Sequence, residues 1–252
     1  MSVFIIAEAG SSHDNDLQKA YRLIEAAKEC GADAVKFQWT SRPYSMSDRR
    51  GLGRKAGDMY AQYLYKPVAW LESLKTHCDK VGIEFMCTVY LIEDIATIAP
   101  LVSRFKVSAF ESQWKEFIQA HVAYDKMIIA SVNPGKSVAH RVDRALYCVS
   151  KYPTALEDLH LREHVHEHDG MVYGCDGFSD HTANVLTGAA AVAAGAQIVE
   201  AHIRLNDTEP TNPDYPHSLP VHAHRGNCQN YCKEEDDFED YVRNIRTVER
   251  ML

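Results

Sequence analysis

Two histidines that follow apolar runs are the residues best suited to chemistry: His181 in "GFSDHT" and, 21 positions later, His202 in "QIVEAHIRL". If the two runs form neighbouring parallel strands, both imidazoles lie at one edge of the sheet, where they can share a divalent metal with positions open for water or substrate. A single histidine there would usually be a hydrogen-bonded core residue. Asp180 and Glu200 are candidates to orient the imidazoles, although Glu200 alternates to the same side as His202 and is also a candidate to face the lumen.

Polar residues also gather at the predicted carboxyl ends of the other strands. Two lysines with several hydroxyls suit a small phosphorylated acid, because lysine supplies a point charge and hydroxyls supply hydrogen bonds. One such lysine alone would more often be an exposed side chain, but two at matching strand ends favour a binding site. The candidates are Glu8, Lys36, Gln38, Thr88, Lys106, Ser108, Glu111, Ser131 and Ser150.

The elements that must position these residues follow from the hydrophobic pattern. Short apolar runs rich in Val, Ile, Phe and Tyr alternate with helical periodicity, which is typical of βα units around a parallel sheet. Eight such units in 252 residues predict an α/β fold with a closed (β/α)8 TIM barrel as a single domain over residues 1–252. A doubly wound open sheet fits the alternation too, but "AEAGSSHDND" lacks the glycine spacing of a dinucleotide fold. The predicted strands are 3–8, 33–38, 83–88, 104–108, 126–131, 145–150, 171–176 and 197–202.

Composition narrows the class of protein. The net charge of −8 gives no general field that would gather nucleic acid or anionic lipid. The N-terminal "MSVFIIAEAG" has no basic start and is interrupted by Glu8, so neither a signal peptide nor a membrane span is predicted. Seven scattered cysteines suit reduced core thiols. We therefore expect a soluble, cytoplasmic protein that binds neither nucleic acid nor membrane.

Two predicted loops, 39–66 and 203–235, are too long to be simple connections. Both follow the carboxyl ends of strands, which is the face of a barrel that carries active sites. The first contains "SDRRGLGRKAGDMY", with four basic residues near three glycines. We interpret it as a lid that offers an arginine to an anionic substrate, in preference to a nucleic-acid patch.

The chain resembles the N-acetylneuraminate (sialic acid) synthase family. The likeness runs from about residue 3 to residue 220 and rests on "IIAEAGSSHDNDLQKAYRLIEAAKECGADAVKFQ", "KVSAFES", "YCVSKYPT", "GFSDHT" and "GAQIVEAHIRL". The resemblance implies a barrel enzyme that condenses phosphoenolpyruvate with the open-chain aldehyde of an N-acylhexosamine-like aldose, giving a nonulosonic or related 2-keto acid and phosphate. It also implies a divalent metal, typically manganese.

Site roles carried over from this resemblance fall into three groups. The metal would be held by His181 and His202. Glu111 would manage the attacking water, while Glu8 and Gln38 would line the sugar side and Asp214 would contact sugar hydroxyls. Phosphoenolpyruvate would be held by Lys36, Thr88, Lys106, Ser131, Ser150 and Ser179. Of these, Glu111, Lys106 and Glu8 are the predicted catalytic residues.

The sequence also departs from the family pattern. Ser108 precedes Ala109 where the family usually has a small residue and then serine, so a phosphate-contacting hydroxyl is expected to have moved by one position. "SVNPGK" replaces the usual Ser-Thr-Gly-Met, and "HSLPVHA" lacks a common glutamate. The chain stops at Leu252, where family members usually continue into an antifreeze-like domain. We therefore expect the barrel alone, with an open acceptor specificity and a homodimer as a weak expectation.

Other readings remain open. His222, His224, Cys228 and Cys232 could close a structural zinc site, although exposed histidines and packed thiols are the favoured interpretation. A metal-dependent hydrolase or isomerase of a small phosphorylated sugar would use the same histidine pair to activate water. A barrel that only binds its ligand is the third alternative, supported by the altered motifs after the fourth and fifth strands.

Overall fold

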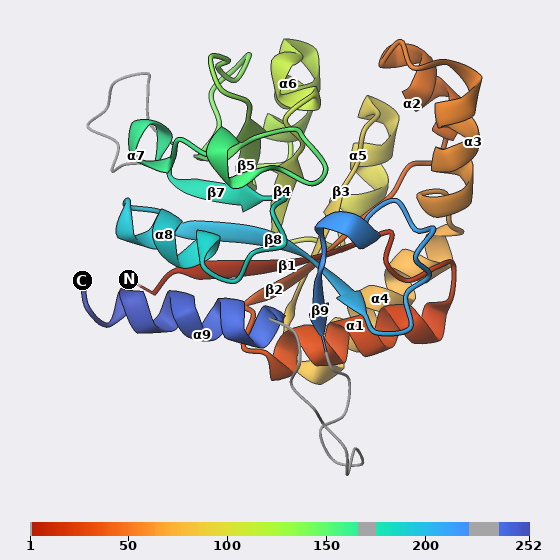
Figure 1. Ribbon diagram of the computed structural model, residues 1–252. Helices are drawn as coiled ribbons and strands as arrows, with labels where there is room; N and C mark the ends of the chain where they lie inside the picture. The colour runs from red at the N-terminus through yellow and green to blue at the C-terminus, as the bar shows by residue number, and fades with distance from the viewer. Residues whose placement is uncertain (1, 166–174, 222–236) are drawn as a thin grey trace.

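Eight parallel strands close into a barrel in the computed structural model, which describes residues 2–165, 175–221 and 237–252 (Figure 1). Each strand pairs with the next, and the ring closes because β1 also pairs with β8, where Glu8 lies opposite His202. A ninth strand pairs in parallel with the last residues of β8, Ile203–Leu205. The strands are β1 (Phe4–Gly10), β2 (Ala34–Gln38), β3 (Glu84–Thr88), β4 (Arg104–Val107), β5 (Met127–Val132), β6 (Arg144–Cys148), β7 (Gly177–Asp180), β8 (Ile198–Leu205) and β9 (Leu219–Val221).

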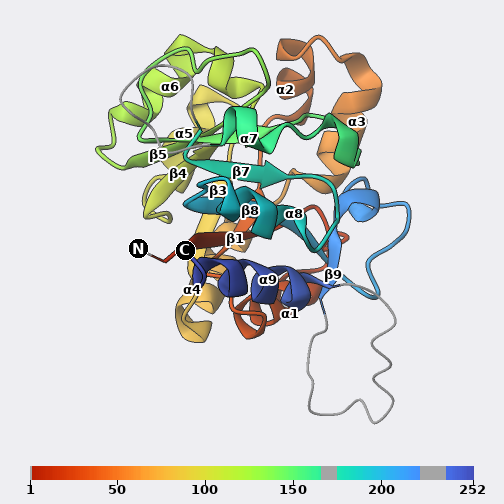
Figure 2. The same cartoon turned by 60° about the vertical axis from the view of Figure 1, so that its left-hand side comes forward.

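Helices surround the barrel, and α8 and α9 lie next to each other in both views (Figures 1 and 2). The two chain ends lie close together, with the Arg246 guanidinium donating to the Val3 carbonyl at 2.7 Å. The α-helices are α1 (Leu17–Glu29), α2 (Pro43–Arg49), α3 (Gly53–Tyr63), α4 (Val68–Val81), α5 (Ile92–Ile98), α6 (Lys115–Val122), α7 (Leu161–His164), α8 (Thr187–Ala193) and α9 (Phe238–Glu249). Short 3-10 turns are η1 (Glu111–Gln113), η2 (Leu156–Asp158) and η3 (Tyr215–His217).

The predicted barrel is confirmed, with two local corrections. The seventh strand is Gly177–Asp180, where Gly177 and Ser179 pair with β6 on one side and β8 on the other. Of the predicted strand 171–176, residues 171–174 lie outside the described part of the chain. A Cβ at Gly177 would lie 2.1 Å from the Ile198 carbonyl oxygen, so this close strand approach requires glycine. Between β5 and β6 the chain runs without an α-helix, and this segment, "NPGKSVAHRVD", contains Pro134 and Gly135, the two residue types least favourable to a helix.

Inside the barrel, side chains of alternate residues form layers, because successive residues of a strand point to opposite faces. The lowest layer is apolar and is separate from the outer core between strands and helices. We call it the floor; its members are Ile6, Ala34, Met86, Ile129, Leu146 and Ile198, with Phe4 against them. Two residues further along five of these six strands the side chains become polar, and there the site begins; on β6 the corresponding residue is Cys148.

The long segment after β2 folds into two helices, α2 and α3, at the carboxyl ends of the strands. Met46, Tyr60 and Leu64 of this segment pack against Tyr90 and Leu91, which follow β3. The predicted lid is therefore a helical hairpin with its own small apolar core, next to the mouth of the barrel. Within the described residues, no helix has the length and hydrophobicity that a membrane crossing requires.

Candidate active site

A ring of polar side chains lies one layer above the floor. We call it the cradle; its members are Glu8, Lys36, Thr88, Lys106, Ser131, Ser179 and Glu200, and all are buried. Lys36 Nζ donates to Thr88 Oγ1 at 3.1 Å, and Lys106 Nζ donates to Ser131 Oγ at 2.7 Å. Lys36 lies two residues after Ala34 of the floor, and Lys106 lies between Phe105 and Val107 of the outer core, so strand alternation puts both lysines in the lumen.

Two carboxylates balance the lysines. Lys36 forms an ion pair with Glu8 on the neighbouring strand, and its Nζ lies 3.7 Å from Glu200 Oε2. Lys106 reaches Glu200 Oε1 across the lumen from β4, at 3.5 Å. Ser179 also donates to Glu200 Oε1, at 3.1 Å. Glu200 was a candidate either to orient an imidazole or to face the lumen, and in the structure its side chain faces the lumen.

Burial and charge set the protonation of this layer. Burial lowers the pKa of Lys36 to about 8, although Glu200 opposes the shift. For Glu200, burial disfavours the charged form, but Lys106 and Lys36 outweigh it and hold the pKa of the carboxyl below its ordinary value. The cradle thus places two lysines against two carboxylates, and an incoming anion can replace a carboxylate beside either lysine.

The histidines lie in the next layer, at the mouth. The ring centroids of His181 and His202 are 5.4 Å apart, and a third imidazole, that of His217 in η3, lies 4.5 Å from His202. His181 Nδ1 lies 3.0 Å from the Val149 carbonyl oxygen, so this nitrogen carries the proton and leaves Nε2 as an acceptor. Burial lowers the pKa of His181 to about 4 and that of His202 well below its ordinary value. Neutral imidazoles are the form that binds a metal.

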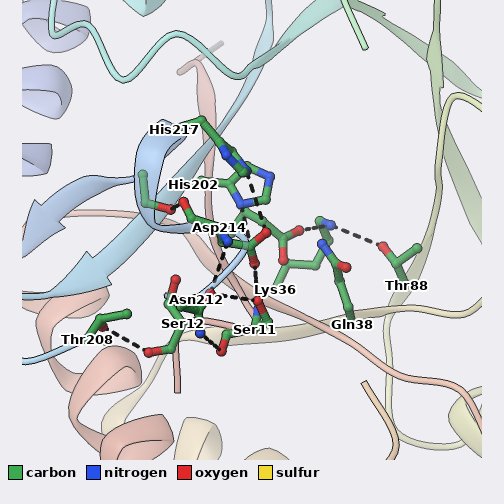
Figure 3. Close-up of polar contacts among 12 residues, drawn as sticks. Ser11, Ser12, Lys36, Gln38, Thr88, His202, Thr208, Asn212, Asp214 and His217 are labelled. Atoms are coloured by element: carbon green, nitrogen blue, oxygen red, sulfur yellow. Dashed lines mark hydrogen bonds and ion pairs between the residues drawn. The ribbon is translucent and has the colours of Figure 1, made fainter. Parts of the chain in front are cut away.

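Asp214 connects the last loop to the first strand (Figure 3). The backbone N–H and the hydroxyl of Ser11 donate to Asp214 Oδ2 at 2.7 and 2.8 Å. Gly10 (φ +48°) comes so close that a Cβ there would lie 2.3 Å from the same oxygen. Burial opposes its ionisation, but His217, His202 and the Ser11 N–H outweigh burial and lower the pKa of the Asp214 carboxyl.

Glu111 lies at the rim, in η1 after β4, and is fully buried. Ser108 donates a hydrogen bond to its carboxylate, which accounts for the shifted serine of this strand. The other partner is Arg50, at the end of α2, whose guanidinium binds both carboxylate oxygens. Tyr90, which lies beside this arginine, donates to Gln38 Oε1 at 2.7 Å.

The structure brings most of the predicted site residues to one mouth. Glu8, Lys36, Thr88, Lys106, Ser131 and Ser179 meet in the cradle; Gln38, Ser108, Glu111, His181, His202 and Asp214 surround it. Ser150 is exposed past the end of β6, where its N–H donates to Asn133 Oδ1 at 3.1 Å, and no contact with the cradle was found within the described part of the chain. The possible zinc ligands His222, His224, Cys228 and Cys232 lie outside the described residues.

Sequence reasoning missed two residues of the mouth, His217 and the particular arginine of the lid, Arg50. Both come from long segments without a strand pattern to place them. The only sequence signal for His217 was its position three residues after Asp214, which puts both on one turn.

The donor set fits a divalent cation. One nitrogen of His202, one oxygen of Asp214 and one nitrogen of His217 all lie within 4.8 Å of one another. The buried atoms His202 Nδ1 and both nitrogens of His217 have no hydrogen-bond partner. In this region four carboxylates (Glu8, Glu111, Glu200, Asp214) face three cationic side chains (Lys36, Lys106, Arg50), so a dication would offset excess negative charge.

Comparison with known proteins agrees with this architecture. N,N'-diacetyllegionaminic acid synthase of Legionella pneumophila is 30% identical over 280 residues, covering 100% of this chain and 74% of that protein. Human N-acetylneuraminate-9-phosphate synthase is 28% identical and covers 99% of this chain and 71% of its own.

Solved structures show the same fold. A crystal structure of N-acetylneuraminic acid (sialic acid) synthetase from Leptospira borgpetersenii, in complex with citrate, superposes with a TM-score of 0.79 at 22% identity, over 100% of this chain and 84% of that one. The model of the NeuB family matches residues 23–252. The chain belongs to the NeuB family.

Proposed function

We propose that this barrel condenses phosphoenolpyruvate with the open-chain aldehyde of an N-acylhexosamine-like aldose, giving a 2-keto acid and inorganic phosphate. One observation carries the proposal: Lys36 and Lys106 meet around Glu200 inside the lumen, one layer below His181 and His202. This arrangement offers an anion site and an electrophile site side by side. Membership of a family whose relatives include legionaminic and neuraminate synthases supports the same reaction.

The cradle would bind the donor. Lys36 and Lys106 would hold the phosphate and carboxylate of phosphoenolpyruvate as point charges, and the hydroxyls of Thr88, Ser131 and Ser179 would donate hydrogen bonds. Because both lysines are buried, these contacts are stronger than they would be in water. The donor would therefore be held directly below the histidines of the mouth.

The mouth would bind the acceptor. His181 and His202 would hold a divalent cation, which we propose to be Mn²⁺, and His217 and Asp214 lie beside them. When bound, the cation supplies Lewis-acid polarisation of the aldehyde oxygen. Gln38, which Tyr90 orients by a hydrogen bond, would contact the sugar on the same side.

Condensation requires one new carbon–carbon bond and one water molecule. The C2–C3 π electrons of phosphoenolpyruvate would form the bond to the aldehyde carbon, whose oxygen takes a proton, and water would add at the electron-poor C2. Glu111 is the group that would accept the proton of this water. The proton that Glu111 takes from water would balance the proton gained by the aldehyde oxygen. The C2 hydroxyl then becomes the keto group as the C–O bond to phosphate breaks, and its proton leaves with the inorganic phosphate.

The test is a screen of aldoses and acylamino sugars with phosphoenolpyruvate and Mn²⁺, in which free phosphate is measured. We expect phosphate to appear only when an aldose is present, in equal amount to a new 2-keto acid. Phosphate release from phosphoenolpyruvate alone would contradict the proposal and indicate a hydrolase.

A further inference from the structure

Three imidazoles, and not the two expected, meet at the mouth of the barrel. His181 follows β7, His202 belongs to β8 and His217 belongs to η3, so each comes from a different element. Their ring centroids are 5.4, 4.5 and 6.0 Å apart for the pairs 181–202, 202–217 and 181–217. All three side chains are buried. Histidines this close and this buried need a shared partner, because a buried imidazole without one loses its hydrogen bonds to water.

Each imidazole turns one nitrogen toward a fixed acceptor. His181 Nδ1 lies 3.0 Å from the Val149 carbonyl oxygen. His202 Nδ1 lies 3.9 Å from Asp214 Oδ2, and His217 Nε2 lies 3.5 Å from Asp214 Oδ1 (Figure 3). This is the usual arrangement of metal-binding histidines, in which the nitrogen that does not bind the metal points to a carboxylate or a carbonyl.

The second nitrogen of each ring is then left for a ligand. For His217 this is Nδ1, which is fully buried and has no hydrogen-bond partner. Imidazoles that share one metal at a metal–nitrogen distance of about 2.1 Å have ring centroids roughly 4.5 to 5.5 Å apart, and somewhat more for wide angles. The separations of the pairs 181–202 and 202–217 lie in this range, while the 6.0 Å of the pair 181–217 requires a wide angle at the metal. One nitrogen of His202, one of His217 and one oxygen of Asp214 also lie within 4.8 Å of one another.

The aromatic neighbours hold the third ring in place. Tyr152 contacts both His181 and His217, with ring centroids 4.4 and 5.0 Å away. Ser218 Oγ donates to the Asp214 carbonyl oxygen at 2.6 Å, which fixes the turn that carries His217. The ring is therefore positioned before any ligand arrives.

We propose that His217 is a third imidazole ligand of the divalent cation, with Asp214 as the carboxylate that orients both His202 and His217. The inference rests on the proposed function only in assuming that this mouth takes a divalent cation. A third nitrogen ligand would raise affinity most for Co²⁺ and Zn²⁺, which favour imidazole more than Mn²⁺ does. His217 would thereby set the order of metal preference as well as the strength of binding.

The experiment uses the full chain, freed of metal, and measures Co²⁺, Zn²⁺ and Mn²⁺ affinity by calorimetry together with the visible absorption of bound Co²⁺. His217→Ala removes the ring, and His217→Phe keeps an aromatic ring against Tyr152 but has no ligand nitrogen. We expect both variants to lose at least about 10-fold in Co²⁺ and Zn²⁺ affinity, less in Mn²⁺ affinity, and to change the Co²⁺ spectrum. The exposed His160 provides the control: His160→Ala should keep wild-type affinities.

The proposal would be overturned if both variants kept the wild-type metal affinities and Co²⁺ spectrum. It would also be overturned if His217→Ala lost affinity but His217→Phe kept it, because the ring would then act only by packing. A second measurement needs no variant. Pulsed electron paramagnetic resonance on the Mn²⁺-loaded wild type counts coupled imidazole nitrogens, and two instead of three would also overturn it. None of these readouts involves turnover. A negative condensation assay would therefore contradict the proposed reaction but not the role of His217, and unchanged metal binding would contradict the role of His217 but not the reaction.

Discussion

The guanidinium of Arg50 binds both carboxylate oxygens of Glu111, with Nε 2.8 Å from Oε1 and Nη2 2.6 Å from Oε2. The same guanidinium lies 4.9 Å from the ring centroid of Tyr90 and 5.1 Å from that of Phe110. Burial alone would lower the pKa of Arg50, but Glu111 outweighs burial and raises it, so the arginine stays charged. This one pair connects the helical hairpin of α2 and α3 to the residue proposed to manage water.

Replacing this arginine should impair the reaction more than folding. In Arg50→Lys the charge remains but the two parallel hydrogen bonds are lost, so Glu111 is no longer held in one orientation. We expect kcat/KM to fall by about 10- to 100-fold, as for lost hydrogen bonds to a charged group. Arg54→Ala changes an exposed arginine of the same hairpin and should leave the rate unchanged. If Arg50→Lys were as active as the wild type, the proposed role of Arg50 in orienting Glu111 would be wrong.

The pH dependence of donor binding should report Lys36. Its pKa of about 8 means that the amine is cationic at lower pH and neutral at higher pH. We therefore expect kcat/KM for phosphoenolpyruvate to be constant below that pH and to fall above it. Lys36→Arg, which stays charged, should move the fall to higher pH even if the rate is reduced. Lys28→Arg, on the outside of α1, serves as the control, and an unchanged profile in Lys36→Arg would assign the titration to another group.

Metal removal should abolish turnover. Treatment with a chelator should stop phosphate release, and added Mn²⁺ should restore it in the wild type. His181→Ala should stay inactive at any Mn²⁺ concentration used while its circular dichroism spectrum remains that of a folded barrel. Metal-dependent turnover in this variant would refute the assignment of His181.

The hydrogen bond between Tyr241 and Asp180 should contribute to the stability of the fold but not to the reaction rate. Tyr241 Oη lies 3.0 Å from Asp180 Oδ2, and both side chains are buried. Tyr241→Phe leaves the carboxylate with its other donors, from Thr182 and Thr187, so we expect the free energy of unfolding to fall by only about 1–2 kcal/mol. Denaturant unfolding measures this change. The exposed Tyr65 is the matched control, and a comparable loss in Tyr65→Phe would mean that the hydroxyl is not the cause.

Much of the barrel could be predicted from the sequence because it follows from local rules. Strand alternation determines which residues share a face, so Lys36, Lys106 and His202 could be assigned to the lumen once their strands were recognised. The seventh strand was the exception. Gly177–Asp180 is short and contains two polar residues, and only its pairing with β6 and β8 identifies it.

The alternation of eight strand-like and helical segments was enough to predict the closed barrel, and the period of the strands was enough to place Lys36, Lys106 and His202 in the lumen. Three contacts were visible only in the folded molecule: Arg50 with Glu111, Glu200 with both lysines, and His217 with the histidine pair. The physical reason is that these contacts join segments far apart in the chain. No repeating pattern specifies where a long loop places its side chains, and that place depends on packing against elements formed elsewhere.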